Sequence, residues 1–129
     1  MKNICITGAA GFVASNLITP LRNHNLYLID DLSHGNIKNI RRHTDDLFGC
    51  VDFNDVPESV LNQYDILIHC ATTNLIASQF DPIKTFNNNS LNTISLFKKF
   101  KGKIIFTSTA SVYGQSDTLP TSENSKIKC

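Results

Sequence analysis

The sequence predicts an α/β fold: a doubly wound parallel sheet with strand order 3-2-1-4-5 and helices on both faces. Three observations carry this prediction. Short apolar runs alternate with helical patterns along the chain, the connections between them are short, and the first apolar run ends in a glycine turn that leads directly into a helix. Right-handed crossovers make this strand order the simplest topology, and ligands bind such sheets at the carboxyl ends of the strands.

The composition is that of an ordinary globular protein. The 129 residues are 41% hydrophobic and 18% charged, with a formal net charge of +1, so the chain has room for one domain. Basic and acidic residues are interleaved, which argues against nucleic acid as the main partner. No apolar run is long enough to span a membrane and no signal peptide precedes the first strand, so we expect no membrane partner and a cytoplasmic location.

The cysteines and histidines form neither a disulfide framework nor a metal site. The four cysteines fall at scattered spacings without a Cys-x-x-Cys pair, and the four histidines lack paired ligand spacing. Buried thiols are the better interpretation of the cysteines. His69 ends an apolar run, and we expect it to be a hydrogen-bonded core residue rather than a metal ligand.

The stretch 4–17 combines a buried strand, a glycine turn and the start of a helix. Gly8 ends the strand where a side chain would collide with an approaching ligand. Gly8 and Gly11 let backbone N–H groups and the positive end of the helix approach a pyrophosphate. Ala14 stands where a small residue lets the helix lie close to the strand. The alternative is a plain strand-to-helix turn that needs glycine for its geometry alone. Features elsewhere in the sequence are needed to distinguish a ligand-binding turn from a purely structural one.

A second strand, expected over 26–29 after a helix over 14–21, ends in Asp30 and Asp31. This lies about twenty residues after the glycine turn, where dinucleotide-binding sequences carry an acidic residue for the adenosine ribose. A carboxylate there accepts hydrogen bonds from the ribose hydroxyls and repels a 2′-phosphate, so Asp30 favours NAD over NADP. The alternative is that one of the two aspartates merely opens a turn.

The later elements continue the alternation of strand and helix. We expect a short helix over 37–43, a strand over 47–51, a short helix over 56–63, a strand over 64–71, a long helix over 82–101 and a fifth strand over 103–106. Asp81 and Pro82 suit the start of the long helix. Its asparagines are poor helix formers, so packing must hold it. The residues expected to share one of its faces are Ile83, Phe86, Ser90, Ile94 and Phe97.

Polar or small residues follow every expected strand. Gly8, Asp30, Asp52, Ala71 and Thr109 all fall at carboxyl ends, which the predicted topology brings to one edge of one sheet. This coincidence is harder to explain by structural needs alone than any single motif is.

Six blocks, taken in order, match a known pattern. They are residues 7–17, 30–33, 52–53, 69–71, 81–82 together with Asn89, and 108–114. Together they resemble the extended short-chain dehydrogenases and, more narrowly, the N-terminal part of the NAD-dependent nucleotide-sugar epimerases and dehydratases. The resemblance implies that residues 1–129 are a Rossmann-type NAD-binding domain that stops before the last strands and the substrate domain.

The resemblance also implies a cofactor site that runs from pyrophosphate to nicotinamide. Its residues, in chain order, are Gly8, Gly11, Phe12, Val13, Asp30, Asp31, Asp52, Phe53, Ala71, Thr72 and Asn89. The first four would hold the pyrophosphate, and Asp30 the adenosine ribose. Asp52 and Phe53 would flank the adenine. Ala71 and Thr72 would line the nicotinamide side, with Asn89 supporting the site from beneath by hydrogen bonds.

Thr109 occupies the catalytic Ser/Thr position of the family, where a hydroxyl donates to the sugar oxygen being oxidised. The family's general base, however, is the tyrosine of a Tyr-x-x-x-Lys motif. None of the three tyrosines, Tyr27, Tyr64 and Tyr113, has a lysine four residues further on. The motif lies beyond the Val-Tyr-Gly block in the family. We therefore expect a fragment of a longer enzyme or a truncated gene product, inactive alone.

The whole enzyme implied by the resemblance is a homodimer that oxidises a nucleotide-linked sugar with NAD. The keto sugar is then epimerised, dehydrated or decarboxylated. The alternative is a non-catalytic NAD-binding sensor or truncated pseudoenzyme, although a sensor has no need of the Thr109 hydroxyl. A scaffold that binds no nucleotide would leave Gly8, Gly11 and Asp30 unexplained.

Overall fold

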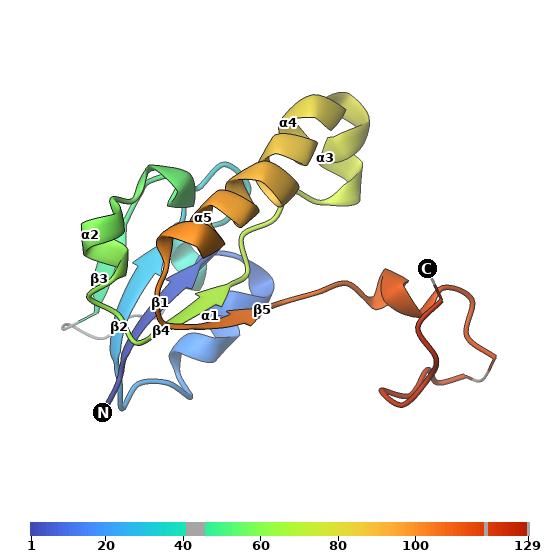
Figure 1. Cartoon of the computed structure of the whole chain (residues 1–129), viewed down its shortest axis with the longest axis horizontal. Helices are drawn as coiled ribbons and strands as arrows, with labels where there is room; N and C mark the ends of the chain where they lie inside the picture. Colours follow the sequence, from blue (N-terminus) through green and yellow to red (C-terminus); the bar gives the residue numbers. More distant parts are fainter. Residues whose placement is uncertain (41–45, 118, 129) are drawn as a thin grey trace.

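A computed structural model of the chain describes residues 1–40, 46–117 and 119–128. Within these ranges five parallel strands form one sheet in the order β3-β2-β1-β4-β5 (Figure 1), as predicted. The strands are β1 (Asn3–Thr7), β2 (Asn25–Ile29), β3 (Leu47–Gly49), β4 (Ile66–His69) and β5 (Lys103–Phe106). β1 is central and pairs with β2 on one side and β4 on the other. The predicted doubly wound sheet is confirmed.

Helices cover both faces of the sheet, with α1 on one face and α2 and α5 on the other (Figure 1). The helices are α1 (Phe12–Ile18), α2 (Glu58–Leu61), α3 (Leu75–Phe80), α4 (Pro82–Phe86) and α5 (Thr93–Lys99). Short 3-10 segments are η1 (Ile37–Asn39), η2 (Phe53–Asp55) and η4 (Ala110–Tyr113), and η3 (Asn87–Asn92) is a π-helix. Among the described residues, no helix combines the length and apolar character needed to cross a bilayer.

Two apolar clusters, one on each face, hold the helices to the sheet. Alternate residues of a strand point to opposite faces, so Ile6 and Cys5 of β1 enter different clusters. Ile6 packs in the cluster that contains Ile18 of α1. Cys5 packs in the cluster that contains Leu61 of α2 and Leu96 of α5. Both faces of β1 are therefore buried, as the apolar run in its sequence predicts.

The region predicted as one helix over 82–101 is divided into α4, the π-helix η3 and α5. Asp81 caps α4 as expected, its Oδ1 accepting a hydrogen bond from Lys84 N at 2.9 Å. The expected common face is not the buried one: Ile83 and Ile94 are exposed, whereas Thr93 is buried. The π-helix accounts for the shifted face of α5, because each additional residue rotates the following helix by about 100°, whereas Ile83 lies in α4 before the π-helix.

Other helix boundaries also differ from prediction. α1 begins at Phe12, two residues before the predicted start, and η1 replaces the start of the helix expected over 37–43, whose last three residues lie outside the described ranges. α3 was not predicted. It begins after Asn74, whose Oδ1 accepts a hydrogen bond from Ala77 N at 2.9 Å. Asn74 is a standard capping residue, so this start signal was present in the sequence.

Residues 107–117 and 119–128 leave the sheet after β5 and extend away from it (Figure 1). The segment closes on itself: Lys128 N donates to Val112 O at 2.8 Å, and Lys128 Nζ pairs with Asp117 Oδ1 at 2.6 Å. No described strand pairs with the outer edge of β5, and Ile105 and Phe106 of that strand are exposed.

Candidate functional site: a cavity at the carboxyl edge of the sheet

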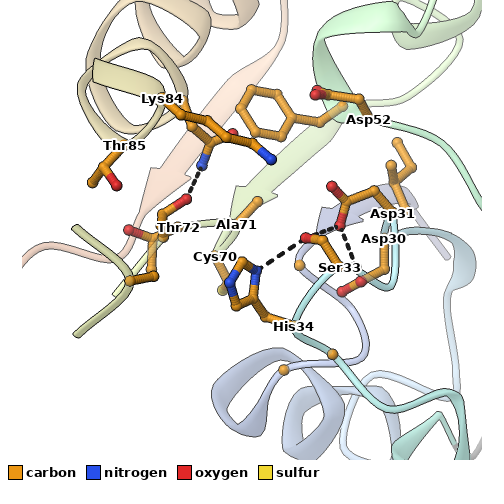
Figure 2. Close-up of a pocket in the computed structure, with 18 of the residues that line it drawn as sticks. Asp30, Asp31, Ser33, His34, Asp52, Cys70, Ala71, Thr72, Lys84 and Thr85 are labelled. Carbon is orange, nitrogen blue, oxygen red and sulfur yellow. Dashed lines mark hydrogen bonds between the residues drawn. The ribbon is translucent and has the colours of Figure 1, made fainter. Parts of the chain in front are cut away.

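A cavity of about 490 Å³ opens at the carboxyl ends of β1, β2 and β4, with α3, α4 and η3 forming its opposite wall (Figure 2). Of the eleven residues predicted to bind the cofactor, eight are among its described lining residues: Gly8, Gly11, Asp30, Asp31, Asp52, Phe53, Ala71 and Thr72. They come from four separate segments of the chain, so the topology alone brings them together.

Gly8 ends β1 with a φ of 69°, in the left-handed region that favours glycine. A Cβ added there would lie 2.7 Å from Ala71 N and 2.8 Å from Cys70 C, which are backbone atoms that cannot swing away. Gly8 was predicted to keep space for a ligand. The structure shows that glycine is needed for packing, because the residues that follow β4 lie directly against the turn.

Phe12 and Val13 do not line the cavity. They are the first two residues of α1 and are 84% and 52% exposed. The preceding residue, Gly11, has extended backbone angles, and no described side chain caps the helix. The first N–H groups of a helix have no partner inside it. α1 therefore presents backbone donors beside the turn, which is where the sequence predicted them.

Asp30 joins the turn after β1 to the turn after β2. Its Oδ2 accepts a hydrogen bond from Ala10 N at 2.9 Å, its Oδ1 accepts one from Leu32 N at 2.8 Å, and the residue is only 8% exposed. The bond to Leu32 is the turn-opening role considered as the alternative. A carboxylate offers about four acceptor positions. Two bonds therefore leave capacity for a ligand in the cavity.

Asp31 is held by Ser33, whose N–H and hydroxyl donate to Oδ1 at 2.9 Å and 2.7 Å. Partial burial raises the pKa of Asp31, but these bonds and the charges of His34 and Lys84 outweigh burial, so the pKa lies below its ordinary value. Figure 2 shows Ser33 between Asp31 and His34. Sequence reasoning missed Ser33 and His34, although both belong to the polar loop that follows the second strand.

Asp52 and Phe53 lie on the wall next to β3. Asp52 caps η2, its Oδ1 accepting a hydrogen bond from Asn54 N at 2.8 Å. Phe53 is 5% exposed, and its ring meets the His69 ring edge-on with centroids 4.9 Å apart. Phe53 thus serves the core and the cavity wall together.

Asn89 lies behind the cavity rather than in its lining. Its Oδ1 accepts a hydrogen bond from Thr73 N at 2.7 Å and its Nδ2 donates to Thr73 O at 2.8 Å. Asn88 adds a bond from Nδ2 to Thr73 Oγ1 at 3.1 Å. The segment after β4 is therefore held to η3 by side-chain hydrogen bonds, and the support of a bound cofactor by Asn89 stays a prediction.

The helical wall contributes residues that sequence reasoning missed. They are Ala77, Phe80, Asp81, Lys84, Thr85 and Asn88. Lys84 points its ammonium group into the cavity (Figure 2), opposite the aspartates. Apart from Asn89, the residues predicted for the site follow strands or the glycine turn, whereas the capped helix start at Asp81 was the signal that a second wall begins there.

Two described lining residues have a shifted pKa. The pKa of Asp31 is lowered, and burial raises that of the Cys70 thiol against a smaller opposing effect of a hydrogen bond with Thr107. Asp31 is therefore anionic and Cys70 neutral near pH 7. Neither is poised to exchange a proton at that pH, so these groups suit binding rather than acid–base chemistry.

Thr109, the predicted catalytic residue, does not line the cavity. It is exposed, and its Oγ1 accepts a hydrogen bond from Ser111 N at 3.2 Å, which caps η4 in the segment that extends away from the sheet. The predicted convergence at one edge therefore includes Gly8, Asp30, Asp52 and Ala71 in this structure but leaves Thr109 outside.

Known proteins share both the sequence pattern and the fold. The chain is 32% identical over 117 residues to UDP-glucuronic acid decarboxylase 4 of Arabidopsis thaliana, a match that covers 86% of this chain and 26% of that protein. It superposes on the UDP-N-acetylglucosamine 4-epimerase of Methanobrevibacter ruminantium with a TM-score of 0.84 and 28% identity, covering 98% of this chain and 44% of that one. The Bordetella bronchiseptica enzyme WbmF, solved with NAD⁺ and UDP, gives a TM-score of 0.71 and 27% identity over 81% of this chain and 35% of its own.

The chain thus spans less than half the length of these relatives. The family match nevertheless covers nearly all of this chain, because residues 4–128 fit the pattern of the NAD dependent epimerase/dehydratase family. With the fold, the strand order and the glycine turn all in agreement, the chain belongs to the NAD-dependent epimerase/dehydratase family.

Proposed function

We propose that residues 1–129 are the NAD-binding part of a longer enzyme that acts on nucleotide-linked sugars. The observation that carries this proposal is the pairing, in one cavity, of a glycine turn at a helix start with the Asp30 carboxylate at the end of the next strand. A dinucleotide needs both features, one for its pyrophosphate and one for its ribose. Relatives that are similar to this chain in sequence or fold are named as enzymes of UDP-linked sugars.

The residues of the cavity suit the parts of NAD. The backbone at Gly8, Gly11, Phe12 and Val13 would donate hydrogen bonds to the pyrophosphate. Asp30, with Asp31 beside it, would accept from the ribose hydroxyls, and Asp52 and Phe53 would lie against the adenine. Ala71 and Thr72 are small enough to admit the nicotinamide, and Asn89 would hold their segment in place through Thr73. When bound, NAD would supply the redox chemistry that converts a sugar alcohol to a ketone.

The chemical steps on the sugar belong to the longer protein in this proposal. Thr109 would donate a hydrogen bond to the sugar oxygen, after its segment has been brought to the cavity by parts of the enzyme beyond this chain. The general base would come from the same region, since no tyrosine here is followed by the required lysine. We further propose that the longer enzyme is a homodimer and that epimerisation, dehydration or decarboxylation follows oxidation.

The chain should bind NAD more tightly than NADP, by roughly tenfold or more, which corresponds to about 1.4 kcal/mol. The reason is that Asp30 would face the 2′-phosphate of NADP, and like charges repel. Asp30→Ala should narrow the preference. Asp30→Asn is the sharper variant, because it removes the charge and keeps an acceptor for one of the two backbone N–H groups.

Isothermal titration of both cofactors measures this preference. Asp55→Asn serves as the control, since Asp55 is an exposed carboxylate outside the cavity lining and its loss should change nothing. Equal affinity for NAD and NADP in the unmodified chain would count against the role assigned to Asp30. Failure to bind either cofactor would count against the proposed function itself.

In the full-length enzyme, Thr109→Ala should lower turnover roughly tenfold to a thousandfold and leave NAD affinity nearly unchanged. The hydroxyl would act on the sugar and not on the cofactor, so turnover should fall while NAD affinity stays nearly the same. Thr109→Ser keeps the hydroxyl and should retain most of the turnover. Steady-state kinetics with the enzyme's nucleotide sugar, alongside NAD titration, give both values, and full turnover in Thr109→Ala would remove Thr109 from the mechanism.

A further inference from the structure

His69 is a buried polar residue in the wall behind the cavity. It is 1% exposed and hydrogen-bonded on both ring nitrogens, Nδ1 to Thr7 Oγ1 at 2.7 Å and Nε2 to Thr93 Oγ1 at 3.0 Å. Thr7 and Thr93 are themselves 0% and 6% exposed. Three rings enclose the imidazole, those of Phe53, Phe97 and Phe106. A plain apolar side chain would fill this space without the need for two buried polar partners.

The hydrogen bonds continue from the two threonines to the backbone. Thr93 Oγ1 donates to Asn88 O at 3.3 Å, and Thr7 Oγ1 accepts from Ala71 N at 3.4 Å. Since the single Thr93 proton is directed to Asn88 O, Thr93 must accept from Nε2 of His69. The imidazole is then the neutral Nε2–H tautomer, and its Nδ1 accepts from the Thr7 hydroxyl. In this series of hydrogen bonds, every donor therefore points in the same direction, from Ala71 N–H towards Asn88 O.

This series of hydrogen bonds begins and ends at backbone groups of residues that line the cavity. Ala71 belongs to the strand wall and Asn88 to the helical wall, where η3 departs from α-helical geometry. Asn88 and Asn89 in turn fasten Thr73, which also lines the cavity. Bonds that are aligned in this way strengthen one another in a dry interior. The buried imidazole thus links the two walls at a fixed spacing.

We infer that His69 is a positioning residue that, through Thr7 and Thr93, holds the backbone of Ala71 and Asn88 at the spacing that the dinucleotide requires. This inference rests on the proposed function of the cavity. It concerns residues that touch no ligand themselves, and its effect should appear in NAD affinity and in the local mobility of the segment 71–73.

Two substitutions of Thr93 separate hydrogen bonding from packing. Thr93→Val keeps the shape and removes the hydroxyl, which leaves Nε2–H and Asn88 O without this partner. Thr93→Ser keeps the hydroxyl and loses a methyl group. We expect NAD affinity of the 129-residue chain to fall about tenfold in Thr93→Val, which loses two buried hydrogen bonds, and to stay within about twofold in Thr93→Ser. Leu26→Val, which removes a methylene group in the other apolar cluster, should lower the thermal midpoint and leave affinity unchanged.

Two measurements do not depend on NAD. In the free protein, amide hydrogen exchange at Ala71 and Thr73 should be faster in Thr93→Val than in Thr93→Ser. Nitrogen NMR of the unmodified chain at pH 7 should show the Nε2–H tautomer for His69, which tests the bond directions even where a variant fails to fold.

Equal NAD affinity and equal exchange in the valine and serine variants would overturn the inference, as would the Nδ1–H tautomer in the unmodified chain. An affinity loss in Leu26→Val as large as that in Thr93→Val would also overturn it, since general destabilisation would then suffice. Absence of NAD binding in the unmodified chain would instead sink the proposed function, whereas the exchange rates and the tautomer would still report on the link between the walls.

Discussion

Replacing Gly8 with alanine should destabilise the chain by roughly 2–5 kcal/mol. The left-handed backbone at Gly8, with a φ of 69°, costs an alanine about 1–2 kcal/mol. The new Cβ would also lie 2.7–2.8 Å from the backbone of Cys70 and Ala71, and crowding of a packed interior costs about 1–3 kcal/mol. Native proteins are stable by only about 5–15 kcal/mol in total. A large part of the stability should therefore be lost.

Gly11→Ala is the matched control for this substitution. Gly11 has an ordinary φ of −76°, and its added Cβ would meet one atom, Gly8 O, at 3.1 Å. The stability loss should be about 1 kcal/mol, the usual penalty for alanine at a helix N-cap. Gly11→Ala should lower NAD affinity more than its small effect on stability would predict, because the added methyl group lies beside the proposed pyrophosphate site. Urea unfolding of both variants gives the comparison, and equal destabilisation would contradict the role assigned to the Gly8 turn.

The Gly8 turn also shows how far sequence reasoning reached. A tight turn at Gly8 was predicted from the strand-to-helix pattern, and the strand order was predicted from the alternation of elements with short connections. Its spatial reason could not be predicted, because the atoms that crowd Gly8 belong to Cys70 and Ala71, more than sixty positions away in the numbering. Pattern reasoning locates the residues that need special backbone geometry, and only the folded chain shows their neighbours.

The helical wall of the cavity was harder to predict. A continuous helix was expected over 82–101, and the run of asparagines indicated weak helix propensity without indicating a π-helix. The extra residue in η3 rotates α5, so that Thr93 is buried against His69 while Ile94 is exposed. A one-residue change of register is invisible to periodicity, yet it decides which side chains reach the site. Lys84 and Asn88 also line the cavity and were not predicted to do so.

Asp30 shows a third limit of prediction from sequence. It has two structural roles that were treated as alternatives. It opens a turn through Leu32 N, and it lines the cavity while tying down Ala10 N. Sequence reasoning weighed these as alternatives because it treats one residue as having one role. A carboxylate with about four acceptor positions serves both. Substitutions at Asp30 should therefore change stability and cofactor preference together, and Asp30→Asn, which keeps one of the two acceptor atoms, should disturb stability less than Asp30→Ala.

The chain should lose stability in mild acid because of His69. Burial lowers the pKa of His69 from 6.5 to about 4, so the folded state takes up this proton only below about pH 4, whereas the unfolded state takes it up below about pH 6.5. Between these values the unfolded state binds more protons, and stability falls as the pH falls. The full stabilisation is present above pH 6.5. Some 2.5 pH units at 1.36 kcal/mol each give a loss of about 3 kcal/mol by pH 4.

Urea unfolding at pH 7 and at pH 4.5 measures this loss, and a substitution of His69 assigns it. His69→Gln should be less stable at pH 7 and should lose most of the dependence between pH 6.5 and 4.5. In the unmodified chain, the NMR signals of the His69 ring should not titrate between pH 7 and 5. A His69 ring that protonates near pH 6.5 in the folded state, or an unchanged pH dependence in His69→Gln, would contradict a buried neutral imidazole fixed between Thr7 and Thr93.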